Sequence, residues 1–233
     1  MGGLRVFTFS ADWGLPTIGP FALKLLAWLR LHDISFEQIF EDNPAKGPLG
    51  KSPWVEIDGR AIADTDVIIT MLAQRHGIPI EEDRTREEAL AGTFKTAFEE
   101  RFHQILEWEL FVHPAGAKYV DKLAKVSFPP VIHYAVAWWM KRHFKRQLYA
   151  RGIARHDDRR IAELGRAEID RLAMLLEGRL YLTGEEPVLA DLAVFGQIAP
   201  PLYWPMRTPV AEYLKQNTTV RAWAERIKQR CFG

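Results

Sequence analysis

The stretch GKSPWVEIDGRAIADTDVII, residues 50–69, decides the fold. It places a proline before one short strand pattern and an Asp-Gly pair between that pattern and the next. An Asp-Thr pair then opens a helix pattern. Asp58-Gly59 predicts a β-hairpin with strands at 54–57 and 60–63, because both turn residues tolerate positive φ.

The residues on either side of this hairpin extend it into a small α/β domain. Compact strand patterns stand at 4–9 and 35–40, and an amphipathic helix between them begins at Pro20, with Gly19 as its cap. A short helix-bearing connection between two strands favours a parallel pair. The helix after the hairpin is expected from Thr65 to His76. The predicted order is β-α-β-β-β-α, with room for a degenerate helix in the loop after the second strand.

Beyond Arg84 the patterns are all helical, and this change marks the domain boundary. We predict an α/β domain at 1–78, a polar linker at 79–86 and an all-helical domain at 87–233. The helices expected in that domain are 86–112, 117–125, 130–149, 158–178, 189–198 and 210–229.

Composition excludes several classes of protein. Thirty-one Lys and Arg against thirty Asp and Glu give a net charge of +1, so no global field favours nucleic acid as a partner. The densest basic stretch, Lys141 to Arg160, is interpreted as a solvated helix face. No apolar run reaches the ~20 residues of a membrane span, and no secretory leader is recognised. A lone Cys231 excludes an internal disulfide, which favours a cytoplasmic protein.

Asp64 and Thr65 open the helix after the hairpin, and this position suits a charged ligand. A helix N-terminus offers free N–H groups to a carboxylate, and Asp64 beside it can hold an ammonium group. The pair therefore fits the zwitterionic end of an amino acid or small peptide. Ordinary capping by Asp64 and an ordinary trans Ser52-Pro53 loop remain the alternatives.

The motif GKSPWVEIDG followed by IADTDVII resembles the glutathione-binding half of glutathione S-transferases. The opening WGLPTIGPFALKLLAWLRLHDISFE is most similar to the failed-axon-connections and metaxin-like branch, including its bacterial members. The resemblance covers the whole chain and implies a thioredoxin-like α/β domain followed by an all-α helical-bundle domain. It also implies glutathione as co-substrate, no metal, a cytoplasmic location and a homodimer.

Several site residues follow from this resemblance. The backbone of Ser52, beside a cis Pro53, would pair with the cysteinyl part of glutathione. Asp64 and Thr65 would hold the γ-glutamyl group, and Lys51 would lie near the glycyl end. The helical domain would supply a wall for an apolar electrophile, although aromatic residues at helical spacing usually belong to a core. The wall residues considered are Trp108, Phe111, His113, Trp138 and Trp139.

The catalytic position departs from the family. Related enzymes lower the pKa of the glutathione thiol with a Tyr, Ser or Cys near the first helix, but Gly19 stands where serine-type members have the hydroxyl. The first tyrosine is Tyr119. Thr17 is the nearest substitute, with Ser10 and Trp13 ranking below it. Without a hydroxyl, a helix N-terminus supplies only ~0.3–1 kcal/mol of preference for the thiolate, which predicts weak activity. The alternative is a hydrogen bond from Thr17 to the sulfur, worth ~1.5–3 kcal/mol, which predicts normal activity.

Two functions therefore stand side by side: a glutathione transferase acting on a small apolar electrophile, as in detoxification, and a non-catalytic binding module similar to metaxins. Two other patterns carry less weight. His103, Glu107 and His113 match no metal motif. At 187–196 the family's capping box would have Ser or Thr where Val188 stands, so Asp191 is expected to provide only half of it.

Overall fold

The computed structural model describes residues 3–79, 85–127 and 129–233. Its first part is a small mixed α/β domain. The elements follow the predicted order, and a short 3₁₀ turn stands in the loop where the sequence allows a degenerate helix: β1 (Arg5–Thr8), α1 (Pro20–Leu31), β2 (Glu37–Phe40), η1 (Pro44–Lys46), β3 (Trp54–Ile57), β4 (Arg60–Ala63) and α2 (Thr65–His76). The predicted α/β class is confirmed.

The four strands form one sheet in the order β2-β1-β3-β4. β1 runs parallel to β2 and antiparallel to β3, and β3 pairs with β4 through the predicted hairpin. Both Asp58 and Gly59 have positive φ, as the turn requires. The predicted parallel pair and the hairpin are thus both present.

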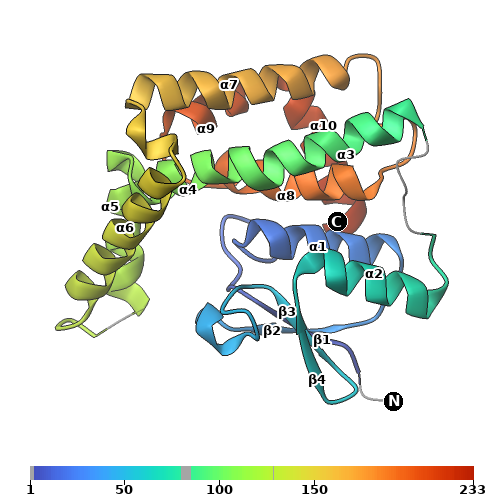
Figure 1. Ribbon diagram of the computed structural model, residues 1–233, viewed down its shortest axis with the longest axis horizontal. Coiled ribbons are helices and arrows are strands. Elements are labelled where there is room, and N and C mark those ends of the chain that lie inside the picture. Colours follow the sequence, from blue (N-terminus) through green and yellow to red (C-terminus); the bar gives the residue numbers. More distant parts are fainter. Residues whose placement is uncertain (1–2, 80–84, 128) are drawn as a thin grey trace.

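The second part is entirely helical, as predicted. Its elements are α3 (Arg86–Ala97), a π turn η2 (Phe98–Phe102), α4 (His103–Phe111), α5 (Pro114–Ser127), α6 (His133–Ala150), a 3₁₀ turn η3 (Ile153–Arg155), α7 (Asp158–Leu175), α8 (Leu189–Tyr203), α9 (Pro209–Gln216) and α10 (Thr218–Phe232). Figure 1 shows α5 and α6 as a hairpin that extends from the helical domain alongside the α/β domain.

Three predicted boundaries need correction. The helix expected at 86–112 is interrupted by the π turn η2, and the one expected at 189–198 continues through Pro200 and Pro201 to Tyr203. The single helix expected at 210–229 is two, because the Asn217 side chain caps a new helix by accepting a bond from the Val220 N–H. Most of the predicted linker, residues 80–84, lies outside the described residues.

The two domains pack through α1, which lies between the sheet and α8 (Figure 1). Most of α1 is buried, including Leu25 and Leu29. Gly196 of α8 faces the first turn of α1, where a Cβ atom would overlap the carbonyl oxygen of Pro20. The absence of a side chain at Gly196 therefore lets α8 approach the start of α1, close to the predicted site.

Candidate functional site at the sheet edge

The register of the sheet brings the predicted site residues to one edge. Phe7 lies opposite Trp54, and Trp54 lies opposite Ala63. The chain that follows β1, the chain that precedes β3 and the chain that follows β4 consequently leave the sheet at the same end. This places the loop before α1, the Ser52-Pro53 bond and the start of α2 next to one another, as a shared site requires.

The Pro53 side of the site has the predicted backbone. The Ser52-Pro53 peptide bond is cis. The hydroxyl oxygen of Ser52 is buried and has no hydrogen-bond partner within the described residues. Trp54, next along the chain, is buried and stacks on Phe7 at a centroid distance of 4.9 Å. Lys51 is exposed. Of these groups, the exposed Lys51 cation is the one that an anionic ligand can contact directly.

The α2 side differs in one respect from the expectation of free helix N–H groups. The Asp64 carboxylate caps the helix: its Oδ1 accepts bonds from the N–H groups of Asp66 at 2.9 Å and Val67 at 3.3 Å. Asp64 itself has φ 73° and is exposed. Both bonds use Oδ1, so Oδ2 remains for an ammonium group. Thr65, at the first helical position, makes no side-chain hydrogen bond within the described chain.

Beneath this cap lies a cluster of four charged side chains that joins the domains. The Lys24 ammonium of α1 lies 2.7 Å from Asp66 and 2.6 Å from Glu99 of the helical domain. Lys95 lies 2.7 Å from Asp66 and 3.0 Å from Glu99. The Lys24 side chain is only 2% exposed, so these pairs hold a buried charge. Lys24 and Lys95 together lower the pKa of Asp66 against the opposing effect of burial.

At the start of α1, Thr17 and Gly19 are neighbours. Gly19 provides no side-chain cap for the helix, and Pro20 occupies its first position. The Thr17 hydroxyl accepts a bond from the Gly19 N–H at 3.2 Å. Thr17 is fully buried, so its side chain presents no surface to a ligand in this arrangement. Of the alternatives, Ser10 bonds the Asp42 carboxylate through both its N–H and its hydroxyl.

One residue contacts this site although no sequence pattern places it there. Tyr119 of α5 reaches the loop before α1, where its hydroxyl accepts a bond from the Trp13 indole at 2.8 Å and donates one to Asp12 at 2.9 Å. Burial raises the pKa of the Tyr119 phenol, which keeps it protonated. Tyr119 lies 106 positions from Trp13 in the chain. A local sequence pattern cannot predict a contact over that separation.

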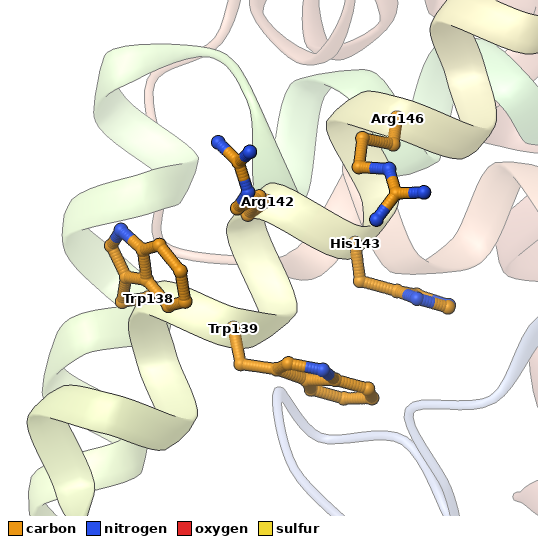
Figure 2. Close-up of a pocket in the computed structure, with 5 residues that line it drawn as sticks. All are labelled: Trp138, Trp139, Arg142, His143 and Arg146. Carbon is orange, nitrogen blue, oxygen red and sulfur yellow. The ribbon is translucent and has the colours of Figure 1, made fainter.

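The five predicted wall residues do not form one surface. Trp108 is buried in the core and its ring lies beside His113, whose Nδ1 accepts a bond from a backbone N–H. Phe111 stacks on Phe144. Trp138 and Trp139 are 61% and 57% exposed. Figure 2 shows them on α6 with Arg142, His143 and Arg146, around a hollow formed by this one helix.

The remaining sequence features have structural partners. His103 bonds Gln197 at 3.0 Å. Asp191 accepts bonds from Val188 N–H, Leu182 N–H and the Trp223 indole, so the predicted half of the capping box is present. Within the described ranges, no cluster of His, Cys, Asp and Glu could hold a metal ion, and no helix combines the length and apolarity needed to cross a membrane.

Comparison with family models defines the class. A model of the glutathione S-transferase N-terminal domain matches residues 20–116, and a model of the glutathione S-transferase C-terminal domain matches residues 165–227. The first begins directly after Gly19 and includes the Ser52 to Thr65 segment. The chain is therefore a glutathione S-transferase-like protein with both domains in the family order, as the sequence resemblance predicts.

Individual relatives are distant. Failed axon connections of Drosophila melanogaster is 24% identical over 98% of this chain, which spans only 58% of the length of that protein. The isoprene-epoxide glutathione S-transferase of Rhodococcus sp. strain AD45 is 21% identical, with 97% of this chain and 98% of the enzyme covered. The structure of the β-etherase LigF from Sphingobium sp. strain SYK-6 shares the fold with a TM-score of 0.60 at 19% identity, covering 97% and 95% of the two chains.

Proposed function

We propose that the protein binds glutathione at the sheet edge and conjugates its thiol to a small apolar electrophile. The observation that carries this proposal is the exposed Asp64 carboxylate at the start of α2, whose cap bonds use only Oδ1, at the same sheet edge as the cis Ser52-Pro53 bond. The exposed Asp64 carboxylate lies beside Thr65. In the proposed complex Asp64 Oδ2 holds the γ-glutamyl ammonium, and Thr65 holds the carboxylate at the positive end of α2.

The thiol of a ligand held in this way lies toward the start of α1. Since α1 has no side-chain cap, its first N–H groups stabilise the thiolate, and Thr17 acts as a positioning residue that fixes the Gly19 amide. The thiol proton passes to solvent, a sulfur–carbon bond forms, and the leaving group departs or an epoxide ring opens. A helix N-terminus worth ~0.3–1 kcal/mol shifts the thiol pKa by less than about one unit, so conjugation is slow.

A non-catalytic glutathione-binding module is the second candidate. The full burial of Thr17 and the missing side chain at Gly19 favour it, because they leave no hydroxyl exposed to the sulfur on α1. The proposed transferase further implies a cytoplasmic, detoxifying homodimer. Both functions require the same ligand, so binding is tested first.

The decisive experiment combines Asp64→Asn with two ligands, glutathione and its analogue without the γ-glutamyl amine. Asparagine keeps an acceptor for the α2 cap and tolerates positive φ, but it removes the negative charge. Calorimetry should show that the variant binds glutathione roughly tenfold to a hundredfold more weakly, the effect of a charged hydrogen bond of ~1.5–3 kcal/mol. Binding of the analogue should be equal in variant and wild type.

Asp58→Asn is the matched control, because Asp58 also has positive φ and is exposed in the same domain, but it lies in the hairpin turn. It should leave binding unchanged. Absence of glutathione binding by the wild type would refute both candidate functions. Binding without any turnover of an activated aryl chloride or epoxide would support the non-catalytic module.

A further inference from the structure

The hairpin of α5 and α6 carries an unusual charge distribution. From residue 122 to residue 156 the chain contains eight Lys and Arg and no Asp or Glu. With a net charge of +1 for the whole protein, the rest of the chain is net negative. Six of these cations have no carboxylate partner within the described residues: Lys122, Lys125, Arg142, Lys145, Arg146 and Arg155, the last of which bonds the Tyr149 carbonyl oxygen.

The same hairpin exposes large apolar side chains, most of which precede the basic stretch Lys141 to Arg160 that the sequence predicts to be a solvated helix face. At its tip Val126 is 83%, Val131 91% and Ile132 49% exposed. Tyr134, Trp138 and Trp139 follow on α6, each more than half exposed. Elsewhere in the described chain, exposed large apolar residues are scattered over several elements. Exposed apolar residues gathered in one place mark an interaction surface.

These residues are ordered along the helix. At 1.5 Å per residue, the tryptophans lie about 10 Å from Ile132 and the arginines about 15–21 Å from it. Aliphatic groups therefore come first, aromatic rings next and guanidinium groups last. Arg142 lies over the Trp138 ring at 5.6 Å, and Figure 2 shows both side chains projecting from the same part of α6. This sequence of groups matches the depth profile of a membrane interface, where Trp and Tyr occupy the headgroup level.

We propose that the α5–α6 hairpin docks, tip first, on an anionic lipid surface. Val126, Val131 and Ile132 enter the acyl boundary, the tryptophans lie among the headgroups, and the arginines contact lipid phosphates. Interfacial segments bury their apolar face about 5–10 Å deep, and each Lys or Arg near an anionic surface strengthens binding. The protein would bind peripherally, and the docking is independent of glutathione.

Other partners fit the hairpin less well. A nucleic acid would contact the cations and stack on the tryptophans, but exposed valine and isoleucine gain nothing from phosphates. A symmetric contact with a second copy would place the basic stretch against itself. Only a bilayer offers negative charge and an apolar layer together, at the spacing that α6 presents.

Sedimentation with vesicles tests the proposal. Wild-type protein should pellet with phosphatidylcholine vesicles containing about 30% phosphatidylglycerol, pellet weakly with pure phosphatidylcholine, and be released at about 0.5 M salt. Arg142→Glu with Arg146→Glu should lower the partition coefficient roughly thirtyfold or more. Trp138→Ala with Trp139→Ala should lower it several-fold and keep the salt dependence.

The control is Arg60→Glu with Arg86→Glu, an equal charge change at two exposed positions outside the hairpin. It should leave vesicle binding intact, and circular dichroism should show that all variants are folded. Equal pelleting with neutral vesicles, or an equal loss in the control, would overturn the proposal. The proposal would also be overturned if the wild type did not bind vesicles and a mass measurement showed that the hairpin variants abolish self-association. Binding of an oligonucleotide in place of vesicles would overturn it as well. Quenching of wild-type tryptophan by brominated lipid provides a readout that needs no variant.

Discussion

The Trp13 indole donates a hydrogen bond of 2.8 Å to the hydroxyl of Tyr119, which joins the loop before α1 to helix α5 of the other domain. The same hydroxyl donates to Asp12 at 2.9 Å. Trp13 also packs edge-on against Trp204 of the helical domain. The sequence resemblance predicts the thiol-activating group near this loop, and these contacts mean that the position of the loop depends on the helical domain as well as on the sheet.

Tyr119→Phe should release this loop. The substitution removes both hydrogen bonds and keeps the ring, so we expect a loss of stability of about 1–2 kcal/mol and faster amide exchange over residues 10–18. Urea unfolding and hydrogen exchange measure the two effects. Tyr134→Phe is the control, because Tyr134 is 67% exposed and its hydroxyl makes no bond in the described structure. Equal exchange in both variants would show that the loop is held by other contacts.

Gly19→Ser should increase conjugation. Gly19 has φ −82°, which any residue adopts, and a Cβ there would lie 3.2 Å from the Phe9 ring and 3.6 Å from the Thr17 hydroxyl. A hydroxyl added at the start of α1 can donate to the thiolate, and we expect kcat/KM to rise about tenfold. Gly19→Ala is the matched variant, since it adds the same Cβ without a donor. A comparable gain in Gly19→Ala would exclude the hydroxyl as the cause.

Lys24→Met should destabilise the protein by about 3 kcal/mol, because the change leaves Glu99 beside a buried apolar side chain with one partner fewer. Lys118→Met, at an exposed position, should have little effect. Combining Lys24→Met with Glu99→Gln should recover part of the loss in urea unfolding, since the stranded charge is then removed. If Lys24→Met alone has the same free energy of unfolding as the wild type, the charged cluster does not stabilise the domain interface.

The buried carboxyl of Glu109 should give stability a pH dependence. It accepts bonds from the Thr208 hydroxyl and from the Val210 and Ala211 N–H groups at the start of α9, yet burial raises its pKa to about 7. The unfolded chain loses this proton near its ordinary value of 4.5, before the folded chain does. Stability should therefore fall as the pH rises from about 4.5 to about 7.

Glu109→Gln should flatten this decline, although the variant loses stability at low pH through weaker capping. Asp191, whose pKa burial raises to about 6, adds a slope of the same sign that the variant retains. Thermal unfolding at several pH values measures the difference. Glu177→Gln, at an exposed position, should retain the full wild-type slope. A parallel decline in Glu109→Gln and wild type would assign the effect to other groups.

Local sequence signals are sufficient to predict the elements of the α/β domain, but they are insufficient to predict the contacts between the two domains. The Asp58-Gly59 turn and the Thr65 to His76 helix obey short-range rules, and the structure has both. The helix at 189–198 was predicted too short because Pro200 and Pro201 normally end a helix, but here burial against α1 overrides that preference. Asn217 was not recognised as a cap within an apparently continuous pattern.

The candidate site follows the same division. Ser52, Asp64 and Thr65 are neighbours because strand register places them together, and their motif is contiguous enough to be recognised. Tyr119 and Lys24 act across a domain interface, over separations of 106 residues to Trp13 and 75 residues to Glu99. Sequence periodicity does not specify which distant side chain makes such a contact between domains.

The close contact between Gly196 and Pro20 limits how the two domains can be recombined. A chimera that joins this α/β domain to the helical half of another transferase would need glycine at the matching position. Any larger residue would wedge the halves apart at the turn where the sulfur is expected. An exchange of helical halves to alter substrate preference should therefore keep glycine at this position, because the α/β domain requires it.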